Sequence, residues 1–565
     1  KVTSSLSQLR LPPTVQGILA SRIDRLSAEQ KELLQTLAVI GRESPLGLIR
    51  KVAAITEEQL KRMLSDLRAA EFIYEQPALT EAEYVFKHAL TQEVAYNSLL
   101  RERRKQIHER AAQAIEALFA LNLSDQYSEL AHHYARSGNG SKAVKYLRLA
   151  AEQAMSRSAY MEARDRLNSA LELLHAQPDE PERDRTEISL RFSLNICMKF
   201  SGGLGTAASV ENMERARQLC EMVGDDTSLF EALDALEDQY FQSAEHQKIQ
   251  AVGEELLKIA TRTNNSEMLG RALFWLGAFS GMRGEFTAAA EALEQARSLS
   301  ARGWLMRDAQ GWYDWRIETR TYAAPVWWTL GFPERAMARS AESFEVARAI
   351  AASPSLLMIA LSFSSFLNLR CRDWKMALSH IDEAKRLADE YGMIDPTGFF
   401  RGWAVARLGQ PEDGLAKMLP ARGWMTALRR WRPLFFWGLA DVYLALGDAR
   451  QGLEAVNHAL EVGPGESEAE LRRLKGELLL IADEGAVAEA TQCFRDAIEL
   501  ARRQSAKSWE LRATMSLTQL LASKGRRDEA RAMLASIYGW FTEGFDTADL
   551  KDAKALLNEL EGTRT

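Results

Sequence analysis

Polar and apolar positions follow the period of an α-helix along much of the chain, and from about Tyr127 onward the helical stretches come in pairs. Each pair has one helix, a short turn that usually holds a glycine, and a second helix with alanines at packing positions. The pattern is clear in LAHHYARSGNGSKAVKYLRLAAEQA at 130–154 and in LADVYLALGDARQGLEAVNHALEV at 439–462. The sequence therefore predicts a series of helical hairpins.

The turns between paired helices recur at a nearly constant interval. Six of them fall 37 to 41 residues apart, at Gly331, Arg372, Gly409, Gly447, Gly485 and Gly525. This spacing is typical of stacked helical hairpins, which bury their apolar faces only against their neighbours. We therefore predict an all-α fold: a right-handed α-solenoid of TPR-like (tetratricopeptide-like) hairpins over 121–565. Turn glycines such as Gly138, Gly284, Gly447 and Gly525 are expected in the left-handed backbone region.

The first 120 residues follow a different pattern. A helical face at 14–26 is followed by a second helix, for which Ser27 and Gln30 have the spacing of a capping box. A short helix is expected at about 45–53, and a fourth helix capped by Thr56 follows it. FIYEQPALTEAEYVFKH then predicts a β-hairpin. We predict a small winged-helix domain with a leading helix over 1–120.

The charges of this domain do not favour DNA binding. The candidate recognition helix, from Glu57 to Glu71, carries three basic and four acidic side chains. A helix that reads a major groove must offset phosphate charge. A packing module is therefore the favoured interpretation. RERRK at 101–105 is interpreted as a solvated helix face, with a patch for RNA or an acidic partner as the alternative.

Composition narrows the classes of function. Lys and Arg number 71 against 78 Asp and Glu, so the net charge is −7 and no nucleic-acid partner is expected. No apolar run is long enough for a membrane span, so we expect no membrane partner and a cytoplasmic location. The four scattered cysteines are interpreted as small buried residues. The start at Lys1 and the stretch KVTSSLSQLRLPP lead us to expect a preceding domain.

Long stretches at both ends of the chain resemble one family. They are LPPTVQGILASRIDRLSAEQKELLQTLAVIGRE at 11–43, YVFKHALTQEVAYNSLLRERRKQIHERAAQAIEAL at 84–118, and ELRRLKGELLL at 470–480 with the region 493–560. These are similar to the region after the nucleotide-binding core of bacterial STAND-class signalling ATPases, which are often fused to a class III adenylate or guanylate cyclase. The resemblance implies an upstream ATPase domain in cis that holds ATP or ADP and Mg²⁺, and no cofactor in this chain.

The same resemblance assigns a role to one histidine. In STAND proteins a histidine of the winged-helix domain reaches back to the phosphates of the bound nucleotide. The matching residue in FKHALTQEVAY is His88. An imidazole at a helix start can donate to a phosphate oxygen and titrates near physiological pH. The alternative is a histidine that only ties the hairpin to the next helix.

We expect no catalysis by this chain. It contains no G-x-x-x-x-G-K-[ST] motif, so the phosphate loop of an ATPase is missing. The glycine-rich SGGLGTAAS at 201–209 lacks the third glycine and the preceding strand of a dinucleotide site. His132 and His133 are adjacent rather than at HExxH spacing, so no metal site is expected there.

Tryptophans gather in the middle of the solenoid. Of the 13, eleven fall between Trp275 and Trp437. They are interpreted either as bulky filler between layers or as aromatic anchors for an effector in a concave groove. The candidate effector-binding residues are Trp312, Trp315, Arg316, Arg320, Trp327 and Trp328, with the two arginines at helical spacing to bind a carboxylate. The groove interpretation predicts that loss of Trp327 and Trp328 weakens binding with little change in thermal unfolding.

The sequence therefore favours a non-catalytic sensor region of a larger signalling ATPase. Its solenoid would bind a protein, peptide or small-molecule effector and relay this through the winged helix. The alternatives are a stand-alone scaffold for protein–protein interaction and an ATP-dependent transcription regulator. The second alternative is less favoured, because such regulators end in a DNA-binding helix-turn-helix and this chain ends in ADLKDAKALLNELEGTRT.

Overall fold

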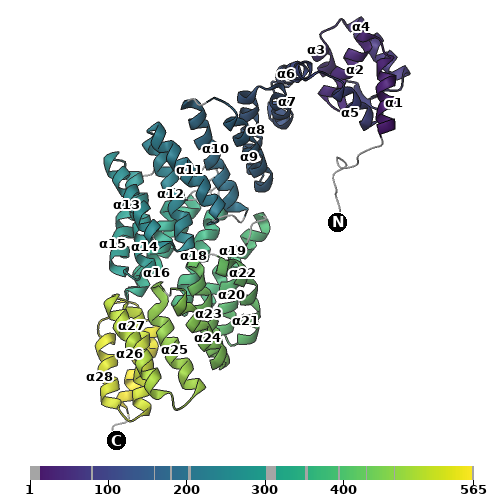
Figure 1. Ribbon diagram of the computed structural model, residues 1–565. Helices are drawn as coiled ribbons and strands as arrows, with labels where there is room; N and C mark the ends of the chain where they lie inside the picture. The colour runs from purple at the N-terminus through teal and green to yellow at the C-terminus, as the bar shows by residue number, and fades with distance from the viewer. Residues whose placement is uncertain are drawn as a thin grey trace. The chain divides into compact units, whose positions relative to one another are not determined.

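The computed structural model describes residues 13–77, 81–157, 159–178, 181–201, 205–300, 314–349, 354–391, 395–427, 429–463 and 465–562 (Figure 1). The chain forms two compact units. The first unit is Lys1–Gly203 with Gln218–Val223, and the second unit is Leu204–Arg217 with Gly224–Thr565. No helix among the described residues has the length and apolar character needed to cross a membrane.

The first unit begins with helices around a small sheet. Its elements are α1 (Pro13–Asp24), α2 (Ala28–Ile40), β1 (Glu43–Pro45), α3 (Leu46–Ala53), α4 (Glu57–Ala69), β2 (Ile73–Gln76), β3 (Glu83–Phe86) and α5 (Ala89–Asn97). The strands are antiparallel in the order β1-β3-β2. The predicted capping box of Ser27 and Gln30 is present at the start of α2, and Thr56 caps α4 as predicted.

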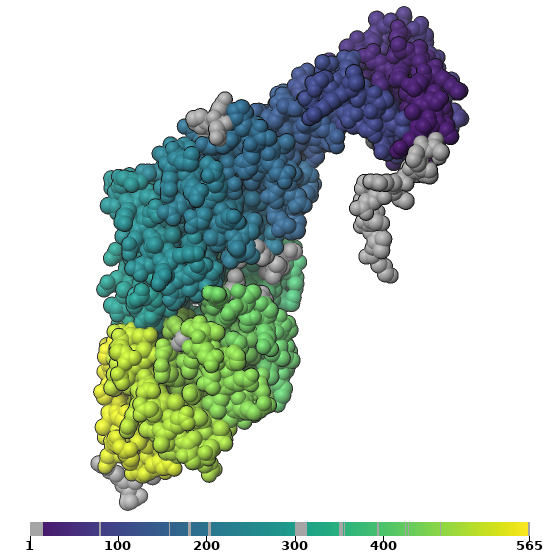
Figure 2. All heavy atoms as spheres, viewed as in Figure 1, coloured from purple at the N-terminus to yellow at the C-terminus, as the bar shows by residue number. Residues whose placement is uncertain are grey.

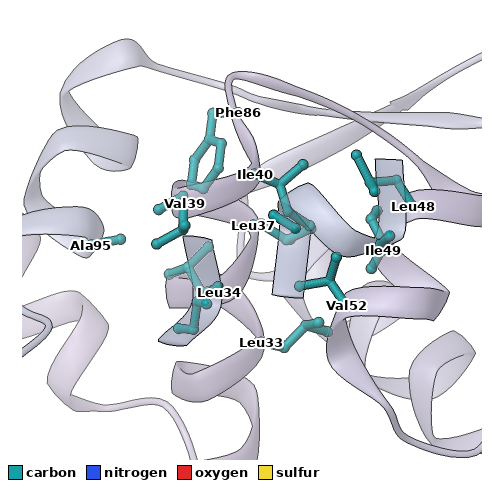
Figure 3. Packing of buried hydrophobic residues seen from close by; sticks show 14 of the residues in the cluster. Leu33, Leu34, Leu37, Val39, Ile40, Leu48, Ile49, Val52, Phe86 and Ala95 are labelled. Atoms are coloured by element: carbon teal, nitrogen blue, oxygen red, sulfur yellow. The ribbon is translucent and has the colours of Figure 1, made fainter. Parts of the chain in front are cut away.

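Apolar side chains of α2 and α3 form the centre of this core. Figure 3 shows Leu34, Leu37 and Val39 of α2 between Ile49 of α3 and Phe86 of β3. The helices form here because α2 and α3 are amphipathic and both turn their apolar faces inward. The β-hairpin closes the core beside α5, and His88 is the residue directly before α5.

The first unit continues into helical hairpins. Its further elements, in chain order, are α6 (Arg101–Leu118), the 3₁₀ turn η2 (Leu123–Gln126), α7 (Tyr127–Ser137), α8 (Gly140–Ser156), α9 (Tyr160–His175) and α10 (Pro181–Phe200). One apolar core runs without a break from Ile23 to Tyr146. The helices on both sides of residue 120 therefore share a core. The domain boundaries 1–120 and 121–565 stay a prediction.

The second unit is built of consecutive helical hairpins, in which each helix packs against the next. Its first half comprises α11 (Ala207–Val223), α12 (Asp226–Ser243), α13 (His246–Arg262), α14 (Ser266–Met282), α15 (Phe286–Ser300), α16 (Trp315–Thr329), α17 (Pro333–Ala349) and α18 (Pro354–Arg370). Residues 218–223 at the end of α11 belong to the first unit.

The second half begins with α19 (Trp374–Tyr391), α20 (Gly398–Arg407), α21 (Pro411–Met418), η3 (Leu419–Ala421), α22 (Arg422–Ala427), η4 (Arg429–Trp431), α23 (Arg432–Leu446) and α24 (Ala449–Glu461). It ends with η5 (Gly465–Ser467), α25 (Glu468–Ala482), α26 (Val487–Arg503), α27 (Lys507–Ser523), α28 (Arg527–Tyr538) and α29 (Ala548–Glu561). The predicted fold class, an all-α solenoid of TPR-like hairpins, is confirmed.

The turns follow the predicted backbone geometry. The four glycines expected in the left-handed region adopt it, with φ from 73° to 89°. They are Gly138, Gly284, Gly447 and Gly525. Arg372 adopts the same conformation with φ 62°, which is unusual for a residue with a side chain. Its side chain makes ion pairs with α29, so the strained turn is held by a tertiary contact.

The last hairpins of the second unit return to its middle hairpins. The Ser508 hydroxyl donates to the Trp328 carbonyl oxygen at 2.5 Å, and the rings of Trp328 and Trp509 meet edge to face with centroids 4.6 Å apart. The backbone N–H of Glu334 donates to the Glu543 carboxylate at 2.9 Å. Figure 2 shows the yellow C-terminal atoms directly against the teal atoms of these earlier repeats. The hairpin stack is therefore closed by contacts about 180 to 210 residues apart in sequence.

Candidate functional site

The second unit holds a cavity of about 800 Å³. It is lined by residues of α14, α16 and α18, the turn before α13, Pro396, Phe400 of α20, residues 429–434 and the segment around η5. The volume lies in the range of pockets that take small organic ligands, about 300–1,000 Å³. We refer to this space as the cavity.

The composition of two helices, α14 and α18, explains why the cavity is open and its walls largely apolar. α14 presents the small residues Gly277, Ala278 and Gly281 to it, so Met282 at the end of the helix is the one large side chain among its described lining residues. α18 is largely apolar, has no distinct polar face, and contributes Met358 and Phe363. A helix of that kind needs apolar neighbours around its whole circumference. Here part of α18 faces the cavity instead.

An irregular segment between α22 and α23 contacts the end of α12. This crossing segment, residues 429–434, includes η4 and the first turn of α23, and it lines the cavity. The indole N–H of Trp431 donates to the Gln242 side-chain oxygen at 3.1 Å. The Arg430 guanidinium lies 4.2 Å from the centroid of the Phe241 ring. The cavity is thus completed by residues nearly 190 positions later in sequence.

Tyr322 of α16 places a polar group in the apolar wall. Its ring contacts those of Phe274 and Phe363, with centroids 5.4 and 5.1 Å away. Burial raises the pKa of Tyr322 to about 12, with the positive charge of Arg430 acting in the opposite direction. Its hydroxyl therefore stays protonated near neutral pH. Within the described part of the chain it has no hydrogen-bond partner, so it is available to donate to a ligand.

Both carboxylates of the lining are already paired. Glu285 accepts from Arg283 at 2.7 Å, and Glu466 accepts from Arg370 at 2.6 Å. Arg370 is only 1% exposed and also lies over the Phe366 ring. Burial lowers the pKa of Arg370, and Glu466 opposes that effect. A buried guanidinium of this kind needs its counter-charge to be tolerated.

The predicted effector-binding residues have other contacts. Trp315 and Trp328 are buried, at 4% and 2% exposure. Trp327 donates its indole N–H to Glu294 at 2.9 Å. Of α16, the residues that line the cavity are Tyr322, Pro325 and Val326.

The two predicted arginines have partners within the protein. Arg316 is paired with Asp314 at 2.5 Å, and Arg320 lies 3.4 Å from the Glu342 carboxylate. Trp312 lies outside the described residues. The effector-binding role of this set stays a prediction, and the burial of its tryptophans favours the interpretation as filler between layers.

His88 is exposed at the start of α5 and makes no capping hydrogen bond there. Its imidazole is therefore accessible to a group outside the chain. The nucleotide-sensing role implied by the family resemblance stays a prediction.

Of the adjacent histidines of α7, His133 is buried with His108 in the first unit, whereas His132 is exposed beside them. His108 of α6 lies between Tyr96 and His133, with Nε2 3.0 Å from the Tyr96 hydroxyl and Nδ1 2.9 Å from Nδ1 of His133. The ring of His132 is 5.9 Å from that of His108. Among the residues that the structure describes, no group of three or more His, Cys, Asp or Glu side chains is arranged to hold a metal ion.

Sequence reasoning missed the cavity residues that matter most, above all Arg430 and Tyr322. A signal was present in MLPARGWMTALRRWRP at 418–433, where the long paired helices give way to short pieces rich in arginine and tryptophan. Most other described helices of the second unit are longer, so the interruption marks the crossing segment. Which distant helix it would reach could not be read from the pattern.

No protein-family model matches the chain. The uncharacterised protein R02095 of Rhizobium meliloti (strain 1021) is 32% identical over 180 residues. The match covers 30% of this chain and 17% of that protein, so the chain spans only a small part of this relative's length.

Several solved structures are similar in fold. The STAND protein with a tetratricopeptide repeat sensor, PH0952 from Pyrococcus horikoshii, is 12% identical with a TM-score of 0.32 over 96% of this chain and 66% of that one. The Cut9–Hcn1 complex of APC/C is 12% identical with a TM-score of 0.45, and the match covers 83% of this chain and 90% of that one. The Rap conjugation gene regulator of plasmid pLS20, in complex with the Phr* peptide, is 12% identical with a TM-score of 0.38, and the match covers 82% of this chain and 98% of that one. The fold class rests on the helical hairpins of the chain itself.

Proposed function

We propose that the chain is the non-catalytic sensor region of a larger signalling ATPase, and that its effector is a small organic molecule bound in the cavity of the second unit. The observation that carries this proposal is a cavity of about 800 Å³ with apolar walls and a few convergent polar groups. A flat outer face of a solenoid would instead favour a protein partner. The cavity is formed by distant hairpins and the crossing segment together, so its occupant can influence the whole unit.

A cavity-filling variant tests this proposal. Ser362 on α18 lines the cavity, and its hydroxyl donates to the Met358 carbonyl oxygen of the same helix. Ser362→Phe adds a ring at the cavity wall. We expect a metabolite library, screened by thermal shift, to contain compounds that stabilise the wild-type chain and no longer stabilise this variant.

Ser298→Phe is the matched control. Ser298 is an exposed serine on α15 whose hydroxyl makes the same kind of bond, to the Gln295 carbonyl oxygen. Compounds that stabilise the wild-type chain should stabilise this variant equally. Stabilising compounds that act equally on Ser362→Phe would place the effector outside the cavity and contradict the proposal.

The relay to the rest of the protein is proposed from the family resemblance. The helices and three-stranded sheet at the start of the chain would act as a winged helix, and His88 would contact the nucleotide phosphates of an upstream P-loop ATPase with bound ATP or ADP and Mg²⁺. Effector binding controls such a relay only if the effector binds two states unequally. In the full-length parent protein, His88→Ala should change the amount of nucleotide that co-purifies. Unchanged ADP occupancy and output would contradict the relay.

The rival function is a stand-alone scaffold that assembles protein partners. One simple observation distinguishes the scaffold from the sensor. The coding sequence upstream of Lys1 should contain a phosphate-loop motif if the chain is part of a STAND-like ATPase, with or without a cyclase. Its absence from the gene would favour the scaffold.

A further inference from the structure

The charges that line the cavity are not balanced. Its lining holds two carboxylates and four guanidinium groups. The two carboxylates, Glu285 and Glu466, are each paired with an arginine. Of the arginines, Arg283 is used by Glu285, and Arg432 donates its Nε–H to the Thr426 carbonyl oxygen. Arg432 has no carboxylate within ion-pair distance among the described residues, but its guanidinium is held by that hydrogen bond. Two guanidinium groups of the crossing segment therefore remain with neither an ion-pair partner nor a hydrogen-bond partner in the described structure.

Those two groups are Arg429 and Arg430. Within the described residues no carboxylate lies within ion-pair distance of either one. Arg429 is exposed, so water can solvate it. Arg430 is half-buried among aromatic rings, with its guanidinium carbon 4.2 Å from the centroid of Phe241, 5.4 Å from Tyr322 and 5.1 Å from Trp431.

The Arg430 Nε is buried and has no hydrogen-bond acceptor in the described structure. An unsatisfied buried donor costs free energy, more so when it carries charge. The rings hold the guanidinium in place by cation–π attraction but accept no strong hydrogen bond. An anionic ligand would supply both missing elements, a counter-charge and acceptor oxygens for a planar donor group.

We propose that the cavity binds an organic anion with one acidic head group and an apolar body, the head on Arg430 and the body along the walls of α14, α16 and α18. This inference rests on the proposed function and names the chemistry of its effector. The Tyr322 hydroxyl, without a partner in the described structure, is a second donor beside Arg430. Val326, Met358 and Phe366 supply the apolar surface for the body.

Three probes with the same tail separate charge from hydrophobicity. Decanoate, decan-1-ol and decyltrimethylammonium carry the same ten-carbon chain with a negative, a neutral and a positive head. Each is titrated into the 565-residue chain by isothermal calorimetry, below the concentration at which it aggregates. We expect decanoate to bind at least about 10-fold more tightly than decan-1-ol, and decyltrimethylammonium to bind most weakly.

Variants of one arginine assign the preference to its site. Arg430→Gln should weaken decanoate binding by about 10- to 100-fold and leave decan-1-ol nearly unchanged, because only the charge-assisted hydrogen bonds are lost. Arg430→Lys should retain part of the preference for the anion. Arg422→Gln is the matched control, since it removes the same charge from an exposed position on α22 that does not line the cavity.

The outcomes separate this inference from the function on which it rests. Equal binding of decanoate and decan-1-ol, both lost in Ser362→Phe, would overturn the anion preference and leave a ligand-binding cavity. Decanoate binding that survives Ser362→Phe unchanged would overturn both. A preference for decanoate that Arg430→Gln and Arg422→Gln reduce equally would reflect the general charge of the surface and would also overturn the inference. The same holds if decanoate does not bind at all.

Discussion

At the scale of single residues, the tryptophans of α16 illustrate how an aromatic cluster gains its role from its partners. Trp328 is buried between the middle and the last hairpins, where it packs edge to face on Trp509 and lies below the Arg512 guanidinium. Trp327 directly precedes Trp328 in the sequence, but it is only half-buried and donates its indole N–H to the Glu294 carboxylate. Trp328 therefore packs between hairpins, whereas the adjacent Trp327 makes a polar contact nearer the surface.

Trp328→Ala should strongly destabilise the second unit. Loss of a buried aromatic side chain and the cavity left behind cost about 3–5 kcal/mol. Chemical denaturation measures the loss directly. Trp540→Ala removes a tryptophan that is 38% exposed and should cost clearly less. A Trp328 variant with unchanged stability and weaker effector binding would instead support the groove interpretation.

The buried histidine of the first unit makes stability depend on pH. Burial, followed by the charges of His133, His132, Arg136 and Arg104, lowers the pKa of His108 to about 3. Glu129 lies 3.9 Å from His133 and is the nearby acidic group of α7. Because the unfolded chain takes up a proton near pH 6.5 and the folded chain does not, stability is full above about pH 6.5 and falls as the pH drops toward 3.

We expect the first unit to lose roughly 2 kcal/mol of stability from His108 between about pH 7 and pH 5. His108→Gln should flatten this part of the profile, measured by denaturant unfolding at several pH values. His458→Gln is the control, because His458 is exposed on α24. An unchanged slope in His108→Gln would show that other groups cause the pH dependence.

At the scale of elements, glycines set how closely paired helices approach. α20 and α21 meet at Gly402 and Gly414, and a Cβ added at Gly402 would lie 2.5 Å from the Gly414 carbonyl oxygen. No side chain fits that distance, so the two helices would have to separate. Trp403, the next residue on α20, donates its indole N–H to Asp441 of α23 at 2.7 Å, so α20 is also joined to α23.

Gly402→Ala should therefore destabilise the second unit, by about 1–3 kcal/mol from overpacking. Gly423 on α22 is the matched control, because a Cβ there would meet no atom within 4 Å. Gly423→Ala should be neutral or slightly stabilising, since alanine restricts the unfolded chain. Equal stabilities of the two variants in denaturant would mean that α20 and α21 can separate without cost.

At the scale of the whole second unit, ion pairs between distant hairpins strengthen the contact of its last hairpins with its middle hairpins. Arg372, in the turn after α18, contacts Asp549 of α29 at 3.2 Å and Asp552 at 2.7 Å. Asp549 is also bound by Arg512 of α27. In an open solenoid each hairpin interacts only with its neighbours, so such distant sites would be independent. Here they are in direct contact.

A double-mutant cycle of Arg372→Gln and Asp549→Asn should reveal this coupling. We expect an interaction free energy within about 0.5–3 kcal/mol, as for other residues in one ion-pair network. The exposed pair Lys385 and Asp389, one turn apart on α19, should couple by only about 0.3–0.5 kcal/mol. Additive effects of the two substitutions would contradict the closure.

The sequence by itself determined the class of fold and much of its local detail. Helical periodicity, the capping boxes at Ser27 and Thr56, and the left-handed glycines are local features, and each depends on residues a few positions apart. The β-hairpin of the first unit was likewise predicted from one short stretch. These features follow from short-range sterics and hydrogen bonding, which a single sequence records directly.

Only the tertiary structure decided where the candidate site lies. Arg430 meets Phe241 across nearly 190 residues, and Trp328 meets Trp509 across about 180. A repeat pattern specifies that each hairpin packs on the next, but it does not specify which distant hairpins meet when the stack closes. That depends on small rotations between hairpins that accumulate along the solenoid. For this reason the sequence pattern pointed to other residues of α16, whereas Tyr322 and Arg430, which line the cavity, emerged only from the closed arrangement.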